Sequence, residues 1–259
     1  MKKILPALFA AAAALFLTAA AVPAFAEGET LPSVNIDVGD KASLQAGART
    51  FVNYCLSCHA ASAVRYNSLR DIGLTDEQIK DNLLFTAGKV GEMMNVGMTR
   101  QDGKEFFNAP PPDLSVEARV RGAEWLYAYL RGFYKDPSTP TGWNNTVFPH
   151  VAMPNVLWQL QGVRAVKEEK PADAKEGKSE GEGEGRGEHA ALKFETVTPG
   201  KLTPAQYDET VRDLVTFMVW MGEPHQLERK QIGFWVLVVF AILIGLTFAL
   251  KSSFWKDVH

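Results

Sequence analysis

Both cysteines of the chain stand close together, in the stretch Cys55-Leu56-Ser57-Cys58-His59. Two thiols at this spacing can form a redox disulfide, bind a metal ion, or add across the two vinyl groups of a haem. The histidine that follows the second thiol is placed to lie under the iron of a haem attached in this way. The motif therefore predicts one haem c, bound covalently through Cys55 and Cys58, with His59 as an axial iron ligand.

Other interpretations of the motif fit the surrounding sequence less well. A thioredoxin-like cysteine pair follows a β-strand, whereas Leu44, Ala48 and Phe51 precede the motif at helical spacing. A structural zinc ion needs four ligands, and the chain has no second Cys/His pair with zinc-finger spacing. A short motif also arises by chance, but the secretory signal described below predicts an exported chain, which favours haem attachment.

The second axial ligand decides which chemistry the iron performs. A haem iron whose second axial position is occupied by methionine or histidine transfers electrons. A haem iron whose second axial position is vacant binds small ligands. Met153 is our candidate, because the neighbouring Pro149 and Pro154 stiffen the loop that carries it. His150, in the same loop, remains a competitor. Residue type alone also admits His189, His225, Met93, Met94, Met98, Met218 and Met221. The last two belong to an apolar stripe with helical spacing, which predicts core positions.

The N-terminus has the layout of a secretory signal. Residues 1–26 begin with Lys2 and Lys3, continue with an apolar run, and end in the small-residue site Ala24-Phe25-Ala26. This layout predicts a bacterial signal peptide that is cleaved after Ala26. The chain is therefore expected to be exported across the cytoplasmic membrane.

A second apolar segment lies near the C-terminus. Residues 232–250 carry no charge and are long enough to cross a bilayer as a helix. We expect residues 227–231 to be juxtamembrane, 232–250 to span the bacterial inner membrane, and 251–259 to form a lysine-bearing cytoplasmic tail. Residues 27–226 would then lie in the periplasm.

The periplasmic part has the size of one domain with an insertion. Residues 167–190 are poor in apolar side chains and rich in Glu, Gly and Lys, which predicts a solvated low-complexity segment. We leave open whether this segment is inert or helps to attract a cationic electron acceptor. The formal net charge of the whole chain is -3, which argues against a nucleic-acid partner.

A further helix is expected directly before the membrane span. Thr203 and Gln206 match a capping box, and Pro204 occupies the first helical position. Gly222 and Pro224 mark its end. This helix would continue through a short connection into the span.

Taken together, these motifs resemble the bacterial cytochrome c1 family, the haem subunits of cytochrome bc1 complexes. The resemblance rests on YCLSCHAASAVRYNSLRDIGL at 54–74, APPPDLS at 109–115, HVAMPN at 150–155 and VRDLVTFMVWMGEPHQLERKQIG at 211–233. It implies that Met153 is the sixth ligand, that Arg121 binds a haem propionate, and that Trp125 is its aromatic partner. Pro112 is expected to pack on the haem and exclude water. The family commonly has tyrosine where this chain has Trp125.

The resemblance also implies a fold and a function. We expect an all-α c-type cytochrome domain with long loops, its last helix packed on the haem helix, plus one C-terminal transmembrane helix. The chain would relay single electrons from a Rieske iron–sulfur protein to a soluble or tethered cytochrome c, within a dimeric complex that contains cytochrome b. The enzyme is that quinol:cytochrome c oxidoreductase, and the chain needs no general base or nucleophile. The alternatives are a free-standing membrane-anchored electron shuttle and a haem enzyme with an open sixth position.

Overall fold

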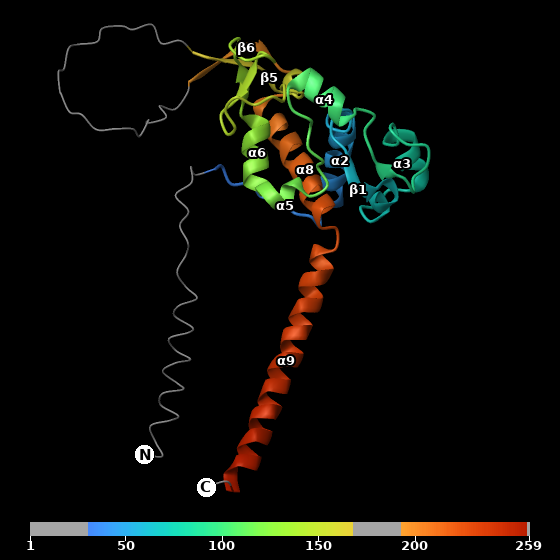
Figure 1. The fold of residues 1–259 in the computed structure, drawn as a ribbon, viewed down its shortest axis with the longest axis vertical. Helices are drawn as coiled ribbons and strands as arrows, with labels where there is room; N and C mark the ends of the chain where they lie inside the picture. The colour runs from blue at the N-terminus through green and yellow to red at the C-terminus, as the bar shows by residue number, and fades with distance from the viewer. Residues whose placement is uncertain (1–30, 168–192, 258–259) are drawn as a thin grey trace, which may run out of the picture. The chain divides into compact units, whose positions relative to one another are not determined.

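The computed structural model describes residues 31–167 and 193–257 (Figure 1). The predicted signal peptide at 1–26 and nearly all of the predicted insertion at 167–190 lie outside the described residues. Figure 1 shows helices α2 and α8 side by side, and the strands β5 and β6 next to one end of α6 and α8. Short helices and loops connect these elements.

Helix α2 (Lys41–Tyr54) carries the residues that precede the cysteine motif. The Asp40 side chain caps its N-terminus by accepting hydrogen bonds from the backbone N–H groups of Ala42 and Ser43. Its buried face includes Leu44, Ala48, Phe51 and Val52, the helical spacing read from the sequence. The helix ends at Tyr54, so the first cysteine of the motif forms its C-terminal boundary.

Helix α8 (Pro204–Gly222) begins with the capping box predicted from the sequence. The Thr203 side chain accepts from the Gln206 backbone N–H, and the Gln206 side chain accepts from that of Thr203. Its buried residues include Val211, Leu214, Val215, Phe217 and Met218.

Helices α2 and α8 pack closely because a glycine lies where they cross. A Cβ atom on Gly47 would lie only 2.1 Å from the backbone carbonyl oxygen of Asp213. The ring centroids of Phe51 and Phe217 lie 5.5 Å apart at the same interface. The Ser43 hydroxyl adds a 2.7 Å hydrogen bond to the Asp213 carboxylate. These two helices form the framework on which the rest of the domain rests.

Apart from the C-terminal helix, the remaining described helices are shorter than α2 and α8. Helices α5 (Glu117–Arg121) and α6 (Ala123–Arg131) pack against α8, and Gly122 between them has a φ of +88°. The others are α3 (Asp76–Asn82), α4 (Arg100–Phe107), α7 (Trp158–Gln161), and the 3-10 helices η1 (Tyr66–Arg70) and η2 (Trp255–Asp257).

The described residues also contain two sheets, so the all-α expectation is correct for the helical framework but incomplete. β1 (Ala61–Arg65) pairs antiparallel with β2 (Met93–Met94). The second sheet has the order β4-β3-β5-β6, formed by Trp143–Asn145, Phe133–Lys135, Gly162–Val166 and Phe194–Pro199. Each strand has six residues or fewer. Such short strands leave almost no period-two pattern in a sequence, which is why the motif analysis missed them.

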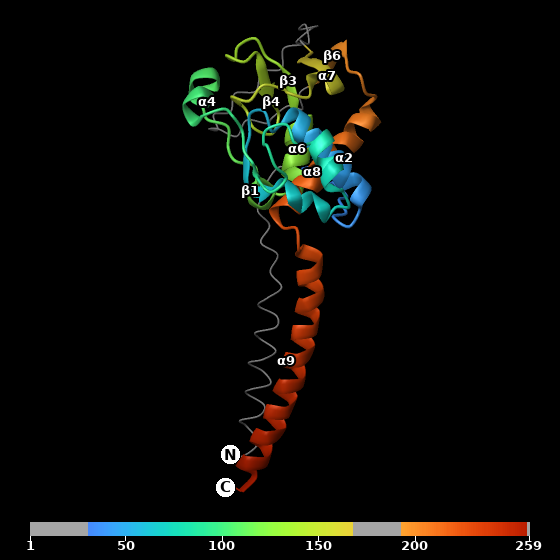
Figure 2. The ribbon, with the colours of Figure 1, turned by 90° about the vertical axis from the view of Figure 1, so that its right-hand side faces the viewer.

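Helix α9 (Gln226–Phe254) contains the predicted span 232–250 (Figure 2). It has 29 residues, a mean hydropathy of 2.6 across its most apolar part, and no buried positions there, so it is long and apolar enough to cross a membrane. Only three residues separate it from α8. Among these, Glu223 forms ion pairs with Arg229 of α9 and, at 4.0 Å, with Arg119 of α5.

Candidate haem site

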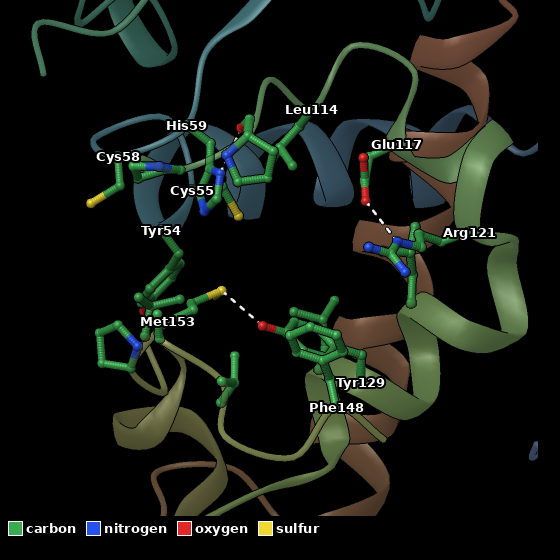
Figure 3. Close-up of a pocket in the computed structure, with 18 of the residues that line it drawn as sticks. Tyr54, Cys55, Cys58, His59, Leu114, Glu117, Arg121, Tyr129, Phe148 and Met153 are labelled. Atoms are coloured by element: carbon green, nitrogen blue, oxygen red, sulfur yellow. Dashed lines mark hydrogen bonds and ion pairs between the residues drawn. The ribbon is translucent and has the colours of Figure 1, made fainter. Parts of the chain in front are cut away.

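One cavity collects the chemistry-bearing residues of the chain (Figure 3). Its volume is about 250 Å³, and most of its lining is apolar. All seven site residues predicted from the sequence line it: Cys55, Cys58, His59, Pro112, Arg121, Trp125 and Met153. They come from five segments: the end of α2, the loop after α4, helix α5, helix α6, and the loop before α7.

The two thiols are free and lie directly after α2. Cys55 is buried, and burial, assisted by the nearby Cys58, raises its pKa to about 12. Cys58 is partly exposed, and its sulfur lies 3.8 Å from the Ser57 hydroxyl. Backbone N–H groups of Cys58 and His59 both donate to the Cys55 carbonyl, which folds the motif into a tight turn. The turn brings both sulfurs and the imidazole to the same cavity.

The His59 ring is fixed by a backbone carbonyl. Nδ1 lies 2.9 Å from the carbonyl oxygen of Pro112, and since a carbonyl can only accept, Nδ1 donates. Burial lowers the pKa of His59, although the bond to Pro112 and the charges of Glu117 and Asp113 oppose that shift. The ring is therefore held as the neutral Nδ1–H tautomer, with Nε2 free for a metal.

The loop that supplies this carbonyl is itself anchored. The Asp113 carboxylate accepts from the backbone N–H groups of Ser62 and Ser115, both at 2.8 Å. These bonds outweigh burial and lower the pKa of Asp113. The Leu114 N–H donates to the Ala60 carbonyl at 2.8 Å. The PPPDLS segment thus lies firmly beside the residues that follow His59.

Met153 faces the cavity from the opposite side (Figure 3). Two almost fully buried asparagines hold its loop. Asn145 Oδ1 accepts from the N–H groups of Val147 and Phe148, at 2.9 and 3.2 Å. Beyond Met153, Asn155 accepts from the Leu157 N–H at 3.0 Å. Sequence reasoning attributed the stiffness of this loop to prolines alone and missed the asparagines.

The competitors of Met153 differ in position. His150 is exposed, has a left-handed φ of +59°, and does not line the cavity. Met94 is fully buried in β2, away from the cavity lining. Met218 of α8 is buried as expected, yet it does line the cavity. Two thioethers, those of Met153 and Met218, therefore reach the site.

A charged pair lies on a third wall (Figure 3). Arg121 Nε donates to Glu117 at 3.1 Å, and its guanidinium carbon lies 4.8 Å from the centre of the Trp125 ring. Arg121 and its predicted aromatic partner are therefore in direct contact. Glu117, which the sequence analysis did not single out, also lines the cavity.

These residues fit a haem. The cavity offers a neutral imidazole and a thioether, the ligand pair of electron-transfer cytochromes c. It also offers two free thiols beside the imidazole, a mostly apolar lining for a macrocycle, and a guanidinium for a carboxylate. A bound haem alone accounts for the presence of all these residue types in one cavity.

Comparison with known proteins decides the family. The model of the Cytochrome C1 family matches residues 35–105 and 190–258. The cytochrome c1 of Allochromatium vinosum is 41% identical over the full length of both chains. The chain belongs to the cytochrome c1 family. Membership of this family implies a haem c cofactor and an oxidoreductase role, and the membrane-helix candidate α9 fits an anchored subunit.

Other similar proteins have a different name or a lower sequence identity to this chain. The protein named ammonia monooxygenase gamma subunit of Nitrosomonas europaea is 42% identical over 88% of this chain and 89% of its own length. The cytochrome c1 of Rhodospirillum rubrum is 28% identical over 85% of this chain and 83% of its own. A chain of a solved hyperthermophilic respiratory Complex III covers 99% of this chain and 98% of its own, with 14% identity and a TM-score of 0.43, too low to establish a shared fold.

Proposed function

We propose that the chain is the membrane-anchored, single-haem cytochrome of a quinol:cytochrome c oxidoreductase. It takes single electrons from a Rieske iron–sulfur protein and passes them to a cytochrome c. The observation that carries this proposal is the cavity itself, which joins the Cys55–His59 motif to Met153 from a distant loop. A bound haem supplies one-electron chemistry at its iron.

The residues of the chain have distinct tasks in this proposal. Cys55 and Cys58 would attach the haem covalently, and His59 and Met153 would ligate its iron. Hydrogen bonds within the protein already hold both side chains in position. Pro112 holds His59, and the bonds made by Asn145 and Asn155 hold the loop of Met153. Little has to rearrange when an electron arrives or leaves. The chain supplies no general base or nucleophile, because no bond to carbon or hydrogen changes here.

The membrane arrangement follows from the two apolar segments. Residues 1–26 export the chain and are removed, α9 spans the cytoplasmic membrane, and the haem domain lies in the periplasm. Cytochrome b, which handles quinol in the membrane, is the expected neighbour of α9, in a dimeric complex. Arg121 binds a propionate, with Trp125 and Pro112 excluding water from the haem.

The ligand assignment is tested by comparing the two methionines of the cavity. Met153→Leu is expected to abolish the low-spin spectrum and to let the haem bind carbon monoxide, because leucine cannot bind iron. Met218→Leu keeps a similar volume and is expected to leave the low-spin spectrum intact. The reverse pattern would transfer the ligand role to Met218. An unaltered spectrum in both variants would exclude both methionines of the cavity as ligands and direct attention to His150.

The membership of a complex is tested by purification from native membranes. Cytochrome b and an iron–sulfur subunit are expected to co-purify with the haem protein after mild solubilisation. A chain that purifies alone would support a free-standing shuttle. Purification with ammonia monooxygenase subunits would instead match the name of the Nitrosomonas relative.

A further inference from the structure

The cavity contains one hydrogen bond that neither the motif nor the family resemblance identified. The Tyr129 hydroxyl of α6 lies 3.4 Å from the Sδ atom of Met153 and donates to it (Figure 3). A thioether sulfur has no proton and can only accept, which fixes the direction of this bond. Burial raises the pKa of Tyr129 well above its usual value, so the hydroxyl keeps its proton at neutral pH.

The Tyr129 ring has little freedom to move away from the sulfur. It stacks on Trp125, with ring centroids 4.8 Å apart and planes inclined by 11°. The ring also makes an edge contact with Phe133, with centroids 5.1 Å apart. The hydroxyl is therefore aimed into the cavity by two aromatic neighbours.

The backbone of Tyr129 is joined to the same loop that carries Met153. Asn145 Nδ2 donates to the Tyr129 carbonyl oxygen at 2.8 Å, while its Oδ1 holds the N–H groups of Val147 and Phe148. Asn145 is 1% exposed, so these bonds lie away from water. The helix and the loop are thus connected twice, once at the backbone and once between hydroxyl and sulfur.

We propose that Tyr129 is a positioning residue that sets the ligand strength of Met153 and thereby raises the reduction potential of the bound haem. This inference rests on the proposed role of Met153 as an iron ligand. A donor on the thioether withdraws electron density from the sulfur, which weakens its donation to the iron. Weaker donation destabilises the oxidised iron more than the reduced iron, so the reduced state gains.

The test compares Tyr129→Phe with Tyr127→Phe in the full chain, in solubilised membranes. Both changes remove one hydroxyl from α6, but the Tyr127 ring contacts the Arg131 guanidinium and does not line the cavity. The measurements are the midpoint potential and the optical band that reports a sulfur–iron bond. Thermal unfolding of each variant shows whether packing has changed.

The expected result is a lower midpoint potential in Tyr129→Phe and an unchanged one in Tyr127→Phe. The net effect of one hydrogen bond predicts a change of about two- to tenfold in the redox equilibrium, and tenfold equals about 59 mV for one electron. The sulfur–iron band should move while the protein stays low-spin. Binding of carbon monoxide by Tyr129→Phe would contradict the proposal, since removal of the donor should strengthen the sulfur–iron bond and not release it.

Equal potentials and identical bands in the two variants would overturn the inference. A merely structural Tyr129 would lower the unfolding temperature and leave the potential unchanged. The result is separable from the ligand assignment, which Met153→Leu tests. If Met153→Leu loses the low-spin state while Tyr129→Phe keeps the wild-type potential, only the present inference fails. If Met153→Leu keeps the low-spin state, the proposed ligand fails first.

Discussion

The His59 imidazole and the Pro112 carbonyl are joined by a 2.9 Å hydrogen bond across 53 residues of sequence. It determines which nitrogen of the histidine carries the proton and leaves the other available for the proposed iron. Pro112 was expected from the sequence to pack on the haem, and the contact that its backbone makes with His59 was not anticipated. Since any residue has a carbonyl, the importance of the position lies in the rigidity of its loop.

That loop should lose stability when the Asp113 carboxylate is altered. In Asp113→Asn, an amide N–H₂ replaces one of two oxygens that accept from backbone N–H groups, so a donor faces a donor. The folded-state pKa of Asp113 is below its unfolded value of about 3.9. Its contribution is therefore fully present above that unfolded value and is lost as the pH falls through the folded pKa.

The measurement is the unfolding temperature of wild type and Asp113→Asn between pH 7 and strongly acidic pH. The unfolding temperatures of the two proteins should differ at neutral pH and become equal in acid. The exposed Asp81 of α3 offers a matched control, and Asp81→Asn should follow the wild type throughout. A constant separation at every pH would show that the charge of Asp113 is irrelevant.

Removal of the Arg121 charge should lower the reduction potential. A guanidinium at the cavity wall favours the less charged, reduced iron, and in the proposed function it pairs with a propionate. Because 44% of the Arg121 side chain is exposed, solvent screening should limit the change to about fivefold in the redox equilibrium. We expect Arg121→Gln to lower the midpoint potential in a redox titration.

Arg119→Gln is the matched control, because Arg119 lies on the same helix but pairs with Glu223 outside the cavity lining. Its potential should equal that of the wild type. Equal shifts in both variants would mean that the general charge of α5 matters, and not a contact of Arg121 with the haem.

The crossing of α2 and α8 should not tolerate a side chain at Gly47. An added Cβ would collide with the Asp213 carbonyl oxygen at 2.1 Å and with the Phe217 Cβ at 2.7 Å. Neither obstacle can swing aside, so the helices must separate. Gly47→Ala should destabilise the domain by about 1–3 kcal/mol in a denaturant titration, as overpacking does. Gly91→Ala, where an added Cβ meets nothing within 4 Å, should have no comparable effect.

Much of the site was readable from the sequence because its chemistry depends on unusual residue types at fixed spacing. The cysteine motif, the proline-flanked Met153 and the capping box at Thr203 each have a local signature, and the structure brings the first two together. The fold class was readable only in part. Helices repeat their pattern over several turns, whereas β3 and β4 have three residues each.

The supporting residues were not readable, because their roles depend on partners far away in the sequence. Tyr129 is one of several aromatic residues in α6, and only its distance to the Met153 sulfur distinguishes it. Asn145 looks like an ordinary turn residue, yet it is buried and connects a helix to a loop. Such contacts are created by tertiary packing, which no local pattern encodes.

The predicted acidic insertion can be removed without disturbing its surroundings. Strands β5 and β6 pair antiparallel on either side of it, with Val166 opposite Phe194, and the Lys167 N–H donates to the Lys193 carbonyl at 2.8 Å. The two chain ends are therefore already at hairpin distance. Replacement of residues 168–192 by Asn-Gly should close them with a two-residue turn. The haem spectrum and the unfolding temperature should stay unchanged.

Residues 168–192 carry eight acidic and four basic side chains, so their removal makes the haem domain less negative. If the segment attracts a cationic cytochrome c, the deletion should slow its reduction by up to about tenfold at low ionic strength. The difference should vanish at high salt, where charges are screened. A matched variant keeps the length and replaces the eight acids with Gln and Asn, which separates charge from bulk. Equal rates for all three proteins at low salt would show that the insertion has no part in attracting the acceptor.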